Sequence, residues 1–216
     1  MQSFNRYALF SFGLFFMGIG IALTTRSELG TSPISSVPYV LSLSLPLSIG
    51  TFTFLLLAFF VLIQKVILGS TFPPLHYLQL LIAPLLGLFI DFGMFITAFI
   101  HPSFYLEKLS LVIIGCLFLA LGVTLQIEAK TIMNAGEAIV KVLADRLNKP
   151  FSSVKVSFDW GLVGVGILLS FISFGGLVGI REGTILSAFL VGFFIKLLRK
   201  GLFAGKSRKK ATNPSN

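Results

Sequence analysis

Six apolar stretches, each close to the ~20 residues that cross the hydrocarbon core of a bilayer as a helix, occupy most of this chain. Of its 216 residues, 55% are hydrophobic and only 12% are charged, and the mean hydropathy is +0.95. Such a chain is expected to fold as an all-α bundle of transmembrane helices, because lipid-exposed backbone must satisfy its hydrogen bonds within each helix. The expected spans are residues 7–24, 49–68, 76–100, 106–127, 154–174 and 183–198.

Two shorter apolar segments, 33–47 and 135–147, interrupt this series, and each is too short to cross the bilayer. We expect them to form re-entrant or interfacial helices inside a single transmembrane domain of residues 1–200. The basic segment 201–216 is expected to be a disordered cytoplasmic tail. No small-residue cleavage site follows the first apolar stretch, so we expect a retained helix there rather than a signal peptide.

The basic residues indicate how these spans are oriented. With six crossings, all but three of the 17 Lys and Arg fall on the side that holds both termini, and the positive-inside rule makes that side cytoplasmic. The net charge of +9 is therefore mainly an orientation signal, and the tail is expected beside anionic lipid rather than nucleic acid. The expected outer residues are Arg26, Lys108 and Arg181. The expected inner residues are Arg6, Lys65, Lys130, Lys141, Arg146, Lys149, Lys155, Lys196, Arg199, Lys200, Lys206, Arg208, Lys209 and Lys210.

The chain also reads as two copies of one unit, residues 6–100 and 105–199. Each copy runs span, short segment, span, span, and Gly20 falls opposite Gly122 while Gln79 falls opposite Thr184. An odd number of crossings per unit would make the second copy inverted, as in many secondary transporters. Residue identity between the halves is low, so coincidence in a chain rich in Leu, Phe and Gly is the alternative.

Both short segments begin with helix-start signals. Ser32 before Pro33 is typical of an N-cap followed by proline at the first helical position. Asn134, with Glu137 three residues later, has the spacing of a capping box. The chain before each segment is small and polar, "SELGT" in the first half and "EAKTIMN" in the second, and we call these stretches the two breaks. Irregular backbone survives in a membrane only where protein or water encloses it. We therefore expect the breaks to line a cavity or its mouths, with helix N-termini that favour anionic groups. The candidate substrate-binding residues are Thr31, Ser32, Gln79, Asp91, Asn134, Glu137 and Thr184.

Asp91 is the strongest of these candidates, because an acid within an expected span is costly in lipid. Gly87, four residues earlier on the same helical face, predicts a notch where another helix approaches the carboxylate. A structural Asp, paired to an Arg or a hydroxyl, is the alternative interpretation. Arg26, Glu28 and Glu128 form gate pairs or solvated rim charges, and we favour the rim because exposed pairs contribute little.

Four segments carry a resemblance to a known group of proteins: "GIALTTRSELGTSP", "SIGT", "LLGLFID" and "GIREGT". They resemble the YczE/YitT-type families of small bacterial integral membrane proteins, and are nearer to the YczE side. The resemblance extends to about Lys200 and implies a multi-pass protein of the bacterial plasma membrane, with no established reaction. The end of the second break together with the helix start after it, "MNAGEA", departs from the family pattern because this stretch lacks a proline.

No sequence pattern indicates an enzyme, a metal site or a cofactor. His76 and His101 have no second ligand at metal-binding spacing, Cys116 is the single cysteine, and nucleotide-binding and hydrolase motifs are missing. Three functions remain: a small-solute carrier, a substrate-capture subunit of an ATP-driven transporter, and a non-transporting accessory or regulatory protein. The expected partners are the lipid bilayer, a small solute, and a second copy or a cytosolic protein. We favour the carrier because of the predicted inverted repeat.

Overall fold

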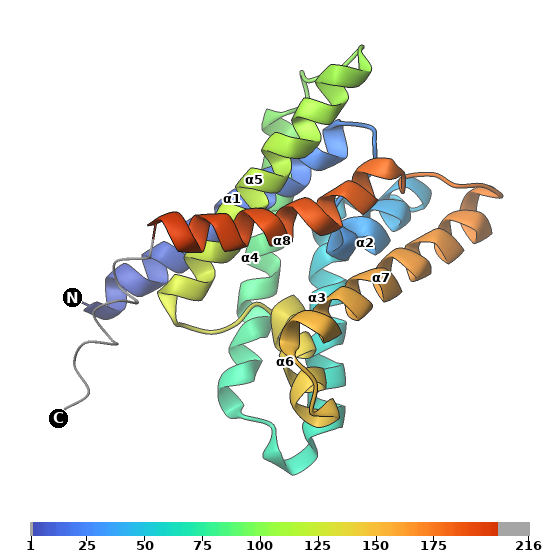
Figure 1. Cartoon of the computed structure of the whole chain (residues 1–216). Helices are drawn as coiled ribbons and strands as arrows, with labels where there is room; N and C mark the ends of the chain where they lie inside the picture. Colours follow the sequence, from blue (N-terminus) through green and yellow to red (C-terminus); the bar gives the residue numbers. More distant parts are fainter. Residues whose placement is uncertain (1, 203–216) are drawn as a thin grey trace.

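The computed structural model describes residues 2–202, and none of these residues forms a strand (Figure 1). The expected all-α architecture is therefore confirmed for this range, while residues 203–216 of the predicted tail lie outside it. Two short 3-10 helices, η1 (Gly69–Thr71) and η2 (Pro74–Leu78), join the third and fourth α-helices. The α-helices are α1 (Gln2–Arg26), α2 (Pro33–Ser44), α3 (Ile49–Leu68), α4 (Gln79–Ile96), α5 (Tyr105–Ala129), α6 (Ala135–Leu147), α7 (Phe151–Phe174) and α8 (Glu182–Leu202).

Five helical segments within residues 2–202 are long and apolar enough to cross a membrane: Asn5–Arg26, Ile49–Thr71, Pro74–Ile96, Tyr105–Ala129 and Ser153–Phe174. They correspond to the first five expected spans. The sixth stretch forms helix α8, but α8 ends in charged turns and is not among the five, so its crossing stays a prediction.

The outer surface of these helices is strongly apolar. Val66 on α3 is 82% exposed, Phe95 on α4 is 79% exposed, and Ile172 on α7 is 71% exposed. So many large apolar side chains this exposed are unusual on a soluble monomer and typical of helices that face lipid. Helix length and surface together indicate a membrane protein.

Helices α1 and α5 lie side by side, with their backbones in close approach (Figure 1). A Cβ atom added to Gly20 would lie 2.7 Å from the carbonyl oxygen of Gly115, and one added to Gly122 would lie 2.5 Å from that of Gly13. The earlier residue of α1 meets the later residue of α5, so the two helices are antiparallel. Helix α4 packs on α1, and α8 packs on α5.

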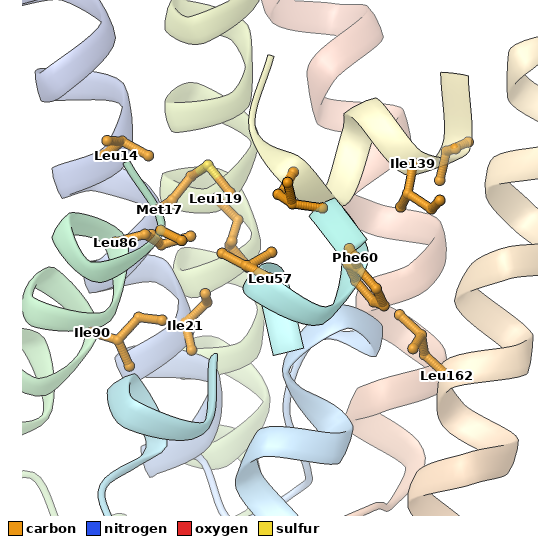
Figure 2. Packing of buried hydrophobic residues seen from close by; sticks show 14 of the residues in the cluster. Leu14, Met17, Ile21, Leu57, Phe60, Leu86, Ile90, Leu119, Ile139 and Leu162 are labelled. Carbon is orange, nitrogen blue, oxygen red and sulfur yellow. The ribbon is translucent and has the colours of Figure 1, made fainter. Parts of the chain in front are cut away.

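The short helices α2 and α6 each pack against both α3 and α7. Their first turns meet, because the side chain of Ile34 lies on Gly136, and Leu57 of α3 lies beside this contact. Figure 2 shows the apolar side chains that continue from here through the bundle. This cluster joins the α1–α4–α5 group to the α2–α3–α6–α7 group, and its members include Leu14, Met17, Ile21, Leu57, Phe60, Leu86, Ile90, Leu119, Ile139 and Leu162.

The starts of the two short helices were predicted correctly, but their caps were not. Pro33 and Ala135 are the first helical residues, yet neither Ser32 nor Asn134 makes a side-chain capping bond. The Ser32 hydroxyl donates to the Ser35 hydroxyl instead (3.0 Å), and the predicted capping box with Glu137 is wrong. Tertiary packing, with Ile34 seated on the first turn of α6, holds these starts in place of the caps.

Candidate functional site

A cavity of about 460 Å³ lies where α1, α2 and α4 end and α3 begins. We call it the Arg26 cavity. The predicted candidates Arg26, Glu28 and Asp91 all line it, so the structure brings these three together. Its other polar lining residues include Tyr39, Ser42, Ser48 and His101.

Asp91 holds the start of α3. The backbone N–H of Gly50 donates to Asp91 Oδ1 (2.9 Å), and the hydroxyl of Ser48 donates to Oδ2 (2.6 Å). The predicted notch is confirmed, because Gly87 lies directly against Gly50. Asp91 was expected within a span, and it lies within two turns of the end of α4, where the helix borders the cavity. Its hydrogen bonds to Ser48 and Gly50 are the contacts that the structural interpretation requires, and its place in the cavity lining is compatible with a binding role as well.

Arg26 and Glu28 do not form the pair that a gate would need. Arg26 Nη2 donates to the carbonyl oxygen of Met94 (2.8 Å), and within the described residues its Nε is enclosed without a partner. Glu28 instead pairs with Lys108 Nζ (2.6 Å), while its side chain stays 58% exposed. The hydrogen bond and positive charge of Lys108 lower the pKa of the Glu28 carboxyl. Glu28 is thus a rim charge, and Glu128 has no ionic partner within the described residues.

The three basic residues expected on the outer side gather at this end of the bundle. Lys108 binds the Glu28 carboxylate, and Arg181 Nη1 donates to the Glu28 carbonyl oxygen (3.4 Å). Arg26 precedes Glu28 by two residues in the chain. Residues from α1, α5 and the α7–α8 connection therefore converge at one end, as the charge pattern predicts.

Thr31, Ser32 and Thr184 lie in a second place, a buried group of hydroxyls. The backbone N–H of Thr31 donates to Thr184 Oγ1 (3.1 Å), and Ser187 Oγ donates to the Thr31 carbonyl oxygen (3.3 Å). The hydroxyls of Thr25 and Thr31 are also hydrogen-bonded (3.0 Å). These bonds tie α8, from the second half of the chain, to the break in the first half.

Gln79, Asn134 and Glu137 lie in a third place, at the first turn of α6. Gln64 Nε2 donates to Gln79 Oε1 (3.0 Å) and weakly to the carbonyl oxygen of Ala135 (3.5 Å). Asn134 Nδ2 and Glu137 Oε2 are enclosed, and neither has a hydrogen-bond partner in the described part of the chain. The start of α4 is thus linked to the first turn of α6 through Gln64 of α3, whereas α8 bonds Thr31 directly.

A second cavity, of about 470 Å³, lies at the other end of the α3–α4 hairpin. It is bordered by Thr131, Ile132 and Met133 of the second break, and by residues of α6 and of the α3–α4 connection. We call it the Thr131 cavity. Each break thus borders one cavity near its own end of the bundle, whereas the seven candidate residues are divided among three places.

Sequence reasoning missed Tyr39, Ser48 and Gln64. Gln64 had a readable signal, because an uncharged amide inside an apolar span must find a partner in the protein. Tyr39 and Ser48 had none, since which side chains face the cavity depends on how α2 and α3 dock.

Glu137 gives a pH-dependent prediction. Burial is the main cause that raises the pKa of its carboxyl; the charge of Lys155 opposes this and that of Asp159 adds to it. A raised native pKa means that the stability contributed by the protonated acid is complete below the unfolded pKa and is lost as pH rises through the native value. We expect Glu137→Gln to raise Tm by a few degrees at pH 7, with the gain vanishing below about pH 4.

Thermal unfolding of the purified protein across that pH range measures the effect. The same substitution at the exposed Glu107, whose carboxylate accepts the backbone N–H of Ser103 (2.8 Å), should give no gain at pH 7. A loss of stability in Glu137→Gln at pH 7 would contradict the prediction, because it would mean that the charged carboxylate is the stabilising form.

Comparison with known proteins extends over the whole architecture. The family of unknown function DUF6198 matches residues 4–200, which include both halves. The uncharacterized protein YyaS of Bacillus subtilis (strain 168) is 29% identical over 191 residues, which cover 88% of this chain and 90% of that protein. No solved structure matches the chain. These similarities concern the complete bundle rather than a fragment, and bring no reaction with them.

Proposed function

We propose that this chain, which belongs to the DUF6198 family of unknown function, is a carrier of a small solute in the bacterial plasma membrane and not an enzyme. The observation that carries the proposal is the pairing of the two halves: each half contributes a short helix whose first turn meets that of the other, and each break borders a different cavity. A carrier with alternating access needs two such halves around one central region.

The contacts between helices support an inverted repeat. The alignment that places Gly20 opposite Gly122 also places Gly13 opposite Gly115. Exchanging the halves therefore converts the contact of Gly13 with Gly122 into that of Gly115 with Gly20, and both contacts are present. The α1–α4 and α5–α8 contacts exchange in the same way, as do the α2–α7 and α6–α3 contacts. A two-fold axis between α1 and α5 would produce this pattern.

A difference between the halves also supports the proposal. Gly87 of α4 lies against Gly50 of α3. The alignment that places Gln79 opposite Thr184 places Gly87 opposite Gly192 of α8, and Gly192 faces open space. Helices α7 and α8 barely touch, while α3 and α4 pack along their length. In any one state of an alternating-access carrier, the two repeats are expected to have different conformations.

For orientation, we propose that the end with Arg26, Lys108 and Arg181 faces outward and that both termini are cytoplasmic. The resemblance to the YczE-type families supports the same location. Ile34 and Gly136, the residues through which the first turns of α2 and α6 meet, line neither cavity. We propose that they separate the two cavities and rearrange during transport.

Counterflow in proteoliposomes tests the carrier. Vesicles that contain the full chain are preloaded with unlabelled bacterial cell extract and diluted into uniformly ¹³C-labelled extract. We expect at least one small metabolite to gain internal label, measured by mass spectrometry, above the level in protein-free vesicles. If the folded protein exchanges nothing, the carrier is contradicted. An ATPase that co-purifies under mild solubilisation would favour the capture subunit instead.

A further inference from the structure

The Arg26 cavity holds a cation and an acid that face one space without neutralising each other. We propose that it binds a zwitterionic solute of the amino-acid type, with Arg26 binding the carboxylate and Asp91 binding the ammonium group. The inference names the substrate class of the proposed carrier and rests on that function for its physiological meaning. Binding itself is measured without transport.

Arg26 is available for an anion. Of its guanidinium nitrogens, Nη2 is bound to Met94, whereas Nε is enclosed and has no partner within the described residues. Glu28, its nearest acid in the chain, is already paired with Lys108. Nη1 makes no hydrogen bond within the described residues and is not among the enclosed atoms, so it is the guanidinium nitrogen that a bound carboxylate can reach. The planar fork of Arg suits a carboxylate in particular.

Asp91 is available for a cation. Its two oxygens accept one hydrogen bond each, from Ser48 and Gly50, and an ionised carboxylate offers about four acceptor positions. The acid is held in place with acceptor capacity left for an ammonium group.

The two charged residues border the same cavity, and both lie at the last turns of α4. Arg26 is anchored on the carbonyl of Met94, three residues and therefore ~5 Å along α4 from Asp91. No ion pair found in residues 2–202 joins Arg26 to Asp91. A solute whose carboxylate and ammonium are neighbours reaches both groups at once. A solute with only one charge would leave the other group uncompensated.

The rest of the cavity fits a side chain. Its volume of about 460 Å³ is within the range of small-molecule sites. Leu43, Leu47 and Ile100 provide apolar wall, and Tyr39 and Ser42 provide polar wall. Charge recognition at one side and a mixed wall at the other predict selectivity for the zwitterionic head over any one side chain.

Thermal shift of the detergent-purified full chain tests the site, with each of the twenty L-amino acids as a probe at millimolar concentration. We expect at least one to raise Tm by a few degrees. For the amino acid with the largest shift, the analogue without its amino group and the analogue without its carboxyl group should give no shift; for leucine these are 4-methylpentanoate and 3-methylbutylamine. No shift from any amino acid, or an equal shift from either analogue, overturns the proposal.

Variants assign the two roles. Arg26→Gln and Asp91→Asn should each abolish the shift, and the amide oxygen introduced by Asp91→Asn can still accept from the Gly50 N–H, which keeps α3 in place. Arg181→Gln removes the same charge at the same end but lies outside the cavity lining, so it should keep the shift. If Arg26→Gln does not fold, Arg26→Lys keeps the charge without the fork and should weaken binding at least ~10-fold. A shift that survives either cavity variant overturns the assignment.

The two proposals fail in different ways. Amino-acid binding without counterflow supports this site and contradicts the carrier. Counterflow of a solute that lacks an ammonium group, unaffected by Asp91→Asn, supports the carrier and overturns the site.

Discussion

Replacing Gly50 by alanine is expected to lower the stability of the protein by about 3 kcal/mol, which for a chain of this size is a fall in Tm of ~6–12 °C. A Cβ atom at this position would collide with the carbonyl oxygen of Gly87 and lie 2.6 Å from the carboxylate of Asp91. Neither neighbour can move freely, because one is helix backbone and the other is hydrogen-bonded to the start of α3. The helices α3 and α4 must therefore separate to accept the methyl group.

Gly192→Ala is the matched control, since Gly192 is the counterpart of Gly87 in the second half and faces open space. The same change there adds a methyl group without a contact, and alanine favours a helix interior by ~1 kcal/mol over glycine. We expect its Tm to be unchanged or slightly raised in the same detergent. If Gly50→Ala is as stable as the parent protein, α3 and α4 do not touch at this point. If Gly192→Ala lowers Tm as much as Gly50→Ala does, α7 and α8 pack closely at Gly192, as α3 and α4 do at Gly50.

The helices could be predicted from the sequence because their signals are local. Residues 49–68 and 135–147 were predicted with the bounds that α3 and α6 have, since length, apolar run and starting residue all lie within the segment. Pro33 marks the start of α2 for the same reason. The cap bonds were predicted wrongly because a polar side chain at a helix start has more than one local partner. The Ser32 hydroxyl donates to the hydroxyl of Ser35, three residues later, instead of accepting a backbone N–H.

In the candidate site, too, features within one helix were predicted and contacts between helices were not. The notch at Gly87 follows from a four-residue spacing within one helix, and it was predicted correctly. The partner of the notch, Gly50, depends on how α3 docks on α4, and no periodicity encodes that. Thr31 and Thr184 were both predicted as candidates, but their mutual hydrogen bond is a contact between the halves. Sequence reasoning therefore found most of the polar residues and could not group them into three places.

A second large effect is expected where Gln64 and Gln79 meet. Both side chains are fully buried, and their amides bond to each other between α3 and α4. Replacing either one by leucine removes one amide and leaves the other enclosed without its partner, with an expected cost of about 2 kcal/mol. Gln126 of α5 is the matched control, because within residues 2–202 its Nε2 has no acceptor other than the weak one, Met17 Sδ, and Gln126→Leu should change Tm much less.

The double variant distinguishes pairing from simple loss of volume or polarity. With both glutamines replaced by leucine, no amide is left without a partner, and two apolar side chains of similar size meet in the same place. We therefore expect the double variant to be more stable than the sum of the single losses by about 1 kcal/mol or more, measured as a thermodynamic cycle in one detergent. Additive losses would show that the two amides do not depend on each other. In that case the start of α4 would not be tied to α3 through this pair.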